Sequence, residues 1–223
     1  GRDITWQKTG SDSDGQSFTV RGVDAEYDLH IPLLGSYQLD NAASAVAALE
    51  ALGSRGIKVP ASAMKIGFEK VTWPCRMEVL SRSPLLVADG AHNVYSVESL
   101  LDSLPKYLEY DRLILVAGFS RDKNVRGMAQ ALLKKADVIY ATASRHPRSL
   151  TPAEVSGLFA DFREIVSEAP TPAEALKMAL DSAGDKDLVL ATGSLFLTAE
   201  VRESALGIEP EIYPELPTLG SSV

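Results

Sequence analysis

The last two thirds of the chain repeat one pattern: a short apolar segment, a turn, and an amphipathic segment. Nearly continuous apolar segments are typical of parallel strands buried on both faces, and the amphipathic segments of the helices that cover them. The expected strands are 77–80, 85–91, 112–119, 137–143, 163–169 and 187–194. The expected helices lie near 94–108, 124–135, 152–161 and 172–183, with a last one after Ser194. The pattern predicts an α/β fold with a mostly parallel sheet and helices on both faces, and Pro105 should kink its helix or end it early.

The first third follows a different pattern. Residues 3–10, 17–22 and 25–35 are rich in β-forming side chains, which predicts three short antiparallel strands. Two helices are expected next, one capped by Asp40 or Asn41 and one covering 61–70. The first of these helices carries an apolar stripe made of Ala42, Ala45, Val46, Leu49 and Leu52.

The change of pattern near residues 71–73 predicts a domain boundary. We expect residues 1–71 to end a central domain and 72–203 to form an independently folding, Rossmann-like C-terminal domain. The tail at 204–223 contains three prolines and is expected to be extended or disordered. The opening GRDITWQKTG has no methionine, so we also expect the chain to be a fragment of a longer protein.

Composition limits the partners. The net charge of −8 argues against long nucleic acids and against anionic membrane surfaces, because phosphate binding needs a basic face. Cys75 is the single cysteine of the 223 residues, which excludes an internal disulfide and a cysteine-based zinc site. A reducing cytoplasm fits this composition, and no apolar run has the length of a membrane span.

Polar residues follow four of the expected strands, at 89–93, 118–124, 143–148 and 192–196. In an open parallel sheet ligands bind at the carboxyl ends of the strands, so these four segments predict one ligand-binding edge. Each segment also has a simpler interpretation. Asp89 and His92 could form a turn whose Asn93 caps the next helix, and spacing alone favours this turn. Lys123 could be a solvated loop charge, and Ser194 could belong to a plain strand-to-helix turn.

Several motifs are missing from the chain. It contains no G-x-x-x-x-G-K-[ST] phosphate loop, no G-x-G-x-x-G after a strand, and no spacing typical of a closed metal site. Cys75 lacks an evident His/Asn partner set and is more typical of a packed residue, while Arg76 on its own is more typical of a surface. An α/β sheet without its own phosphate loop indicates that this chain forms only part of a larger ligand site.

Five stretches together resemble one known family. In order they are GSYQLDNAASAVAALEAL, WPCRMEVL, DGAHN, VAGFSRDKN and ATGSLFLTAEVR. They resemble the C-terminal part of the folylpolyglutamate synthases and the related dihydrofolate synthases of the Mur ligase superfamily. The resemblance covers about 33–203, and DGAHN is its most discriminating part.

The resemblance implies an ATP-dependent ligase that adds L-glutamate to folate, or also forms dihydrofolate from a dihydropteroate-type substrate, through an acyl phosphate. It implies ATP and Mg²⁺ as cofactors. The family's phosphate loop and magnesium ligands lie in the N-terminal part, so 1–71 would end an ATP-binding domain and this chain alone would be inactive.

The resemblance also implies roles for individual residues. Asn41 would face the adenine, Arg76 the phosphates as a catalytic group, Asp89 the ribose, and His92 the nucleotide, with Asp89 and His92 partly exposed in a cleft. A second group, made of Ser120, catalytic Lys123 and Ser194, would lie at the incoming glutamate or acyl substrate.

Two positions depart from the family pattern. Cys75 stands where the family usually has glycine, and Tyr37 where it often has histidine. Two rival functions also stay open: another Mur-type ligase acting on a cell-wall or other carboxylate substrate, and a non-enzymatic α/β nucleotide-binding module.

Overall fold

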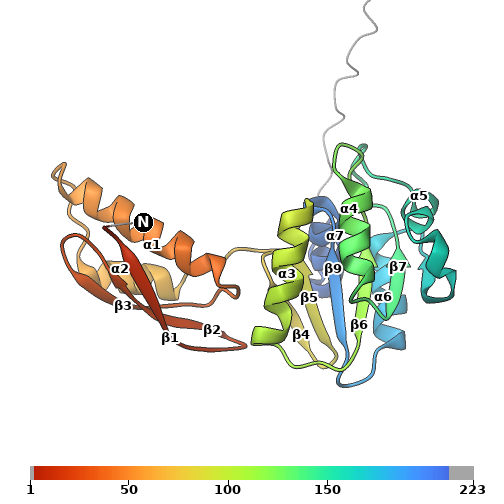
Figure 1. The fold of residues 1–223 in the computed structure, drawn as a ribbon, viewed down its shortest axis with the longest axis horizontal. Helices are drawn as coiled ribbons and strands as arrows, with labels where there is room; N and C mark the ends of the chain where they lie inside the picture. Colours follow the sequence, from red (N-terminus) through yellow and green to blue (C-terminus); the bar gives the residue numbers. More distant parts are fainter. Residues whose placement is uncertain (1–2, 211–223) are drawn as a thin grey trace, which may run out of the picture. The chain divides into compact units, whose positions relative to one another are not determined.

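The computed structural model describes residues 3–210. The chain divides into two compact units, Gly1–Glu78 with Asp102–Glu109 and Val79–Leu101 with Tyr110–Val223 (Figure 1). Domain boundaries at 71/72 and 203/204 remain predictions, and most of the expected tail lies outside the described residues. Within 3–210 no helix combines the length and the apolar character needed to cross a bilayer.

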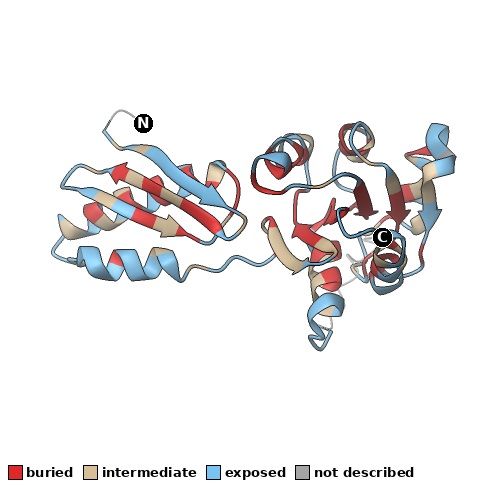
Figure 2. Ribbon diagram, turned by 90° about the horizontal axis from the view of Figure 1, so that it is seen from below, coloured by how far each residue is buried: buried red, intermediate tan, exposed pale blue. Residues whose placement is uncertain are grey.

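The first unit is a three-stranded antiparallel sheet with two helices, as the sequence predicts. Its elements are β1 (Thr5–Asp12), β2 (Gly15–Arg21), β3 (Glu26–Ile31), α1 (Tyr37–Gly53) and α2 (Ala61–Glu69), and the strand order is β1-β2-β3. Alternate residues of β2 and β3 point toward the helices and are buried, while β1 is largely exposed (Figure 2).

Helix α1 differs from its predicted form at both its start and its buried face. It begins at Tyr37 after Ser36, so Asp40 lies inside the helix and does not cap it. The residues that it buries against the sheet are Leu39, Ala42, Ala43 and Val46. The predicted stripe was therefore rotated, since Ala45 and Leu52 are exposed.

The second unit is a six-stranded, mostly parallel sheet, as predicted. Its strands are β4 (Glu78–Arg82), β5 (Leu85–Asp89), β6 (Leu113–Ala117), β7 (Val138–Ala141), β8 (Val166–Glu168) and β9 (Leu188–Thr192). They are ordered β4-β5-β9-β6-β7-β8, and the pairs from β5 to β8 are parallel.

Helices cover both faces of this sheet. They are α3 (Val94–Tyr107), α4 (Val125–Leu133), α5 (Pro152–Gly157), α6 (Pro172–Ser182) and α7 (Leu195–Leu206). Figure 1 shows α3 and α4 on one face and α6 and α7 on the other. Along β6, Ile114 and Val116 pack with the α6 and α7 side chains in one buried cluster. Because strand residues alternate, Leu113 and Leu115 face the opposite layer and are also fully buried.

One predicted helix runs through its proline, and another is divided. Helix α3 continues through Pro105 to Tyr107, so the proline does not end it. The helix expected over 152–161 is split, because α5 ends at Gly157 and a separate 3₁₀ turn covers Ala160–Ile165. Thr151 and Glu154 form a capping box that makes α5 start where it was expected.

Candidate functional site

The four predicted strand-end segments do meet at one edge. They follow β5, β9, β6 and β7, which are neighbours and run parallel, so their carboxyl ends point the same way. Backbone hydrogen bonds join the segments. The Gly193 N–H donates to the Ala91 carbonyl at 3.1 Å, and the Arg121 N–H donates to the Arg148 carbonyl at 2.9 Å. The edge is therefore one connected surface of the second unit.

Asp89, the last residue of β5, is only 3% exposed. This contradicts the expectation that it is partly exposed. One carboxylate oxygen accepts the Ala91 N–H at 2.8 Å, so the carboxylate closes the turn that follows the strand. The sequence showed an acid after a buried strand, but not that the turn would fold over it. Asp89 therefore stabilises the turn that follows β5.

His92 is exposed on the same turn. Its Nδ1 lies 2.9 Å from the Gly90 carbonyl oxygen, which can only accept, so Nδ1 carries the proton. This hydrogen bond from Nδ1 fixes the orientation of the imidazole ring. Asn93 directly precedes α3, and its side-chain oxygen accepts the Ser96 N–H at 2.8 Å, so it caps the helix as the turn interpretation predicted.

Ser120 and Ser194 are brought together at the centre of the edge. Their hydroxyl oxygens lie 3.4 Å apart, and both residues are buried. Ser194 precedes α7, and its side chain makes no capping hydrogen bond to the helix. Gly193 has φ +108°, and a Cβ at this position would lie 2.6 Å from the Gly118 carbonyl oxygen. Only glycine fits there, and it allows the serine loop to approach β6.

Two buried hydroxyls close to this point have no partner among residues 3–210. They belong to Thr192, at the end of β9, and Thr142, directly after β7. Both flank the end of β6, because Thr192 pairs with Ala117 and the Thr142 N–H donates to the Ala117 carbonyl. Buried hydroxyls usually have a partner, so these two mark a place for a water or a ligand. Sequence reasoning assigned no role to either hydroxyl, although each lies near the end of a predicted strand and Thr192 belongs to the polar segment 192–196.

Lys123 and Arg148 share one carboxylate, that of Asp122. The Lys123 ammonium lies 3.2 Å from it and the Arg148 guanidinium 3.4 Å. The hydrogen bond from Lys123 lowers the pKa of Asp122 below its usual range. The loop charges are therefore paired and exposed, and Lys123 would have to leave Asp122 to reach a substrate.

Asn41 and Arg76 belong to the first unit and line one pocket of about 420 Å³. The Asn41 amide nitrogen donates to the Gln38 side-chain oxygen at 2.9 Å. Arg76 is half-buried, and its guanidinium carbon lies 5.6 Å from the centre of the Tyr37 ring. Tyr37 thus packs against the arginine at the position where the family often has histidine.

The residues on either side of Arg76 have unusual backbone conformations. Cys75 has φ 57° and Met77 φ 45°, a region in which glycine is favoured. Both side chains are buried, and the Cys75 N–H donates to the Glu78 carboxylate at 2.8 Å. The glycine that the family usually has at position 75 would adopt this conformation freely, and Cys75 adopts it at a cost.

Cys75→Gly should therefore be no less stable than Cys75→Ala. Inside ordinary helices and strands, alanine makes a protein more stable than glycine does, by about 0.5–1 kcal/mol. A left-handed φ, in contrast, destabilises a residue other than glycine by roughly 1–2 kcal/mol. Both variants lose the same buried thiol, so the comparison isolates the backbone. Urea unfolding of both variants measures which has the larger free energy of unfolding. If Cys75→Ala is more stable than Cys75→Gly by roughly 0.5 kcal/mol or more, as at ordinary positions, the backbone at position 75 is not strained.

No group of three His, Cys, Asp or Glu side chains among residues 3–210 is arranged to hold a metal ion. Sequence reasoning gave no role to Trp73, which it used as a boundary marker and as part of the stretch WPCRMEVL. Trp73 lines the pocket of Asn41 and Arg76, and the aromatic residue directly before Pro74 was the only signal of this in the sequence.

Comparison with protein-family models matches residues 75–195 to the Mur ligase glutamate ligase domain. A folylpolyglutamate synthase of Lacticaseibacillus casei is 31% identical over 210 residues, which cover 92% of this chain and 47% of that protein.

Solved structures give the same result. A Mycobacterium tuberculosis folylpolyglutamate synthase complexed with ADP and AMPPCP superposes with a TM-score of 0.80 at 25% identity, over 92% of this chain and 49% of that one. Escherichia coli FolC in complex with DHPP and ADP gives 0.77 at 25% identity, over 93% and 47%. This chain thus spans about half the length of the proteins that it matches.

Proposed function

This chain belongs to the Mur ligase family, through its glutamate ligase domain, and we propose that it is part of an ATP-dependent ligase that adds L-glutamate to folate. The longer protein is called the parent protein below. Folylpolyglutamate synthases are similar over nine tenths of the chain, which supports the folate substrate over other carboxylates.

The observation that carries the proposal is the edge at the ends of β5, β9 and β6. It combines an exposed imidazole, a pair of serine hydroxyls, the start of a 12-residue helix and a threonine hydroxyl that has no partner among residues 3–210. Hydroxyls and backbone N–H groups at a helix start favour an anion. The edge is therefore suited to hold the carboxylates of an incoming glutamate.

We propose nucleotide-binding roles for residues of each unit, taken separately. Asn41 would face the adenine and Arg76 the phosphates. On the second unit, His92 would lie against the nucleotide, and Asp89 would reach a ribose hydroxyl while keeping its turn. Arg76 lines the pocket with its guanidinium over the Tyr37 ring, which supports a role at a phosphate.

The proposed reaction has two steps. The terminal phosphoryl group of ATP is transferred to a folate carboxylate oxygen, which gives an acyl phosphate and ADP. The glutamate amine then attacks the acyl carbon, phosphate leaves, and the amine loses a proton. Arg76 would offset charge that builds on the phosphoryl oxygens, and Ser120, Ser194 and Lys123 would bind the glutamate carboxylates. Magnesium is proposed for the parent protein, with ligands outside this chain.

A substrate screen with the parent protein tests this proposal. We expect radiolabelled glutamate to be added to folate or dihydropteroate in an ATP-dependent manner, and not to a UDP-muramyl precursor. The 223-residue chain alone should show no turnover, since it contains no phosphate loop. Addition to the muramyl precursor alone would favour the rival Mur-type ligase, and nucleotide binding without any ligation would favour the binding module.

A further inference from the structure

The pocket of the first unit has a feature that the proposed adenine and phosphate contacts leave unexplained. Trp73, at its rim, is 63% exposed, although it is one of the largest apolar side chains of the chain. Pro74 follows it and restricts its backbone to extended conformations, so the indole is presented by a stiff segment. An exposed, stiffly presented aromatic side chain at a pocket rim indicates a surface that a ligand covers.

The rest of the pocket indicates which ligand this is. Most of its lining residues are apolar, and its volume of about 420 Å³ lies in the range of small-molecule sites. The lining residues besides Trp73 are Ile31, Leu33, Gln38, Asn41, Ala42, Ala45, Phe68, Val71 and Arg76. A flat apolar ring system fits between such walls.

Two polar groups of the pocket indicate which ring system it binds. The Asn41 amide uses one N–H for Gln38 and keeps its carbonyl oxygen and second N–H for another partner. An amide that offers one acceptor beside one donor matches the N6 and N7 edge of adenine. Arg76 lines the same pocket and supplies the positive charge for a phosphate that is joined to the ring system.

We propose that Trp73 stacks on the adenine ring of the bound nucleotide and is a further nucleotide-binding residue of this ligase. The inference rests on the proposed function, because it takes ATP as the ligand of the pocket. A pterin is also a flat heteroaromatic ring, but Arg76 and the Asn41 amide favour adenine joined to phosphate.

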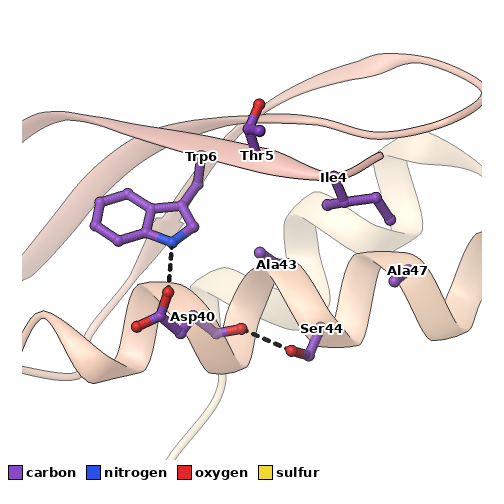
Figure 3. Close-up of a pocket in the computed structure, with 7 residues that line it drawn as sticks. All are labelled: Ile4, Thr5, Trp6, Asp40, Ala43, Ser44 and Ala47. Atoms are coloured by element: carbon purple, nitrogen blue, oxygen red, sulfur yellow. Dashed lines mark hydrogen bonds between the residues drawn. The ribbon is translucent and has the colours of Figure 1, made fainter. Parts of the chain in front are cut away.

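The second tryptophan of the chain is a matched control. Trp6, on β1, donates its indole N–H to the Asp40 carboxylate at 2.8 Å and lies beside Ala43, Ser44 and Ala47 of α1 (Figure 3). These α1 positions are offset by two residues from those that line the Trp73 pocket, so the two tryptophans lie near opposite flanks of the helix. A ligand that stacks on Trp73 should leave Trp6 unaffected.

The test uses the 223-residue chain, which contains two tryptophans. ADP is titrated into Trp6→Phe, which keeps Trp73, and into Trp73→Phe, which keeps Trp6, with fluorescence excited at the red edge of the indole band. We expect ADP to quench the first variant and not the second, and ribose 5-phosphate to quench neither. By calorimetry, Trp73→Ala should weaken ADP binding roughly tenfold, because base–aromatic stacking has about this effect, and Trp73→Phe should weaken it less.

The outcomes separate the inference from the function on which it rests. If ADP binds the wild-type chain and Trp73→Ala with the same Kd and quenches neither tryptophan, the inference is wrong and the nucleotide site stands. Calorimetric binding of folate that depends on Trp73, with no effect of Trp73→Ala on ADP, would also overturn it in favour of a pterin. A wild-type chain that gives no heat with millimolar ADP would contradict nucleotide binding by this chain, and the inference with it.

Discussion

Arg76→Ala in the parent protein is expected to lower kcat about a hundredfold, since removal of one donor to a developing charge costs roughly 10²–10³ in rate. The arginine lies over the Tyr37 ring between two left-handed residues, so its direction is fixed before the nucleotide binds. A group that acts on transition-state charge affects kcat more than substrate affinity, so the Michaelis constant for folate should change little.

The matched control for this variant is Arg55→Ala. Arg55 is an exposed arginine of the same unit that lies in the turn after α1 and outside the pocket. Steady-state kinetics of both variants, with thermal melts of each, should show a loss of turnover for Arg76→Ala alone. An unchanged kcat with a raised Michaelis constant for folate would place Arg76 at the folate and not at the phosphates.

Asp89→Asn in the parent protein is expected to weaken ATP binding roughly tenfold or more, because a hydrogen bond to a charged acceptor contributes about 1.5–3 kcal/mol. The hydrogen bond between Asp89 and the Ala91 N–H allows two substitutions to separate the effect on ATP binding from the effect on folding. Asparagine keeps an oxygen that can accept the Ala91 N–H, so the turn should survive and the melting temperature should change little. Asp89→Ala removes that acceptor and should lower both the melting temperature and the ATP affinity.

Asp185→Asn serves as the charge control, since Asp185 is exposed in the turn before β9, at the opposite edge of the sheet. ATP titration by calorimetry beside a thermal melt compares the three variants. If Asp89→Asn binds ATP normally while Asp89→Ala unfolds at lower temperature, Asp89 has only the structural role that its burial already shows.

The sequence predicted the second unit well because one signal dominates it. Strands such as Leu113–Ala117 are apolar at every position, and a segment of this kind is stable only between two layers of helices. The order of the strands along the chain then placed His92, Ser120 and Ser194 at one edge, and the structure confirms that their strands are parallel neighbours.

Features that depend on packing between distant residues could not be predicted. Helix α1 begins after Ser36 and not at Asp40, although both are good capping residues, because Leu39 is fully buried against the sheet as part of the helix. The burial of Asp89 depends on how its turn closes. The left-handed backbone at Cys75 gave no signal except the glycine that the family usually has there.

The central claim is that the parent protein joins glutamate to folate through an acyl phosphate, and oxygen transfer tests it most directly. Folate labelled with ¹⁸O in the reacting carboxylate is incubated with the parent protein, ATP and L-glutamate, and the released phosphate is analysed by mass spectrometry. The account predicts one ¹⁸O atom in each phosphate released for every glutamate added, because the carboxylate oxygen that takes the phosphoryl group leaves with it. Product that forms while the phosphate stays unlabelled, or labelled phosphate that appears without product containing added glutamate, would contradict it.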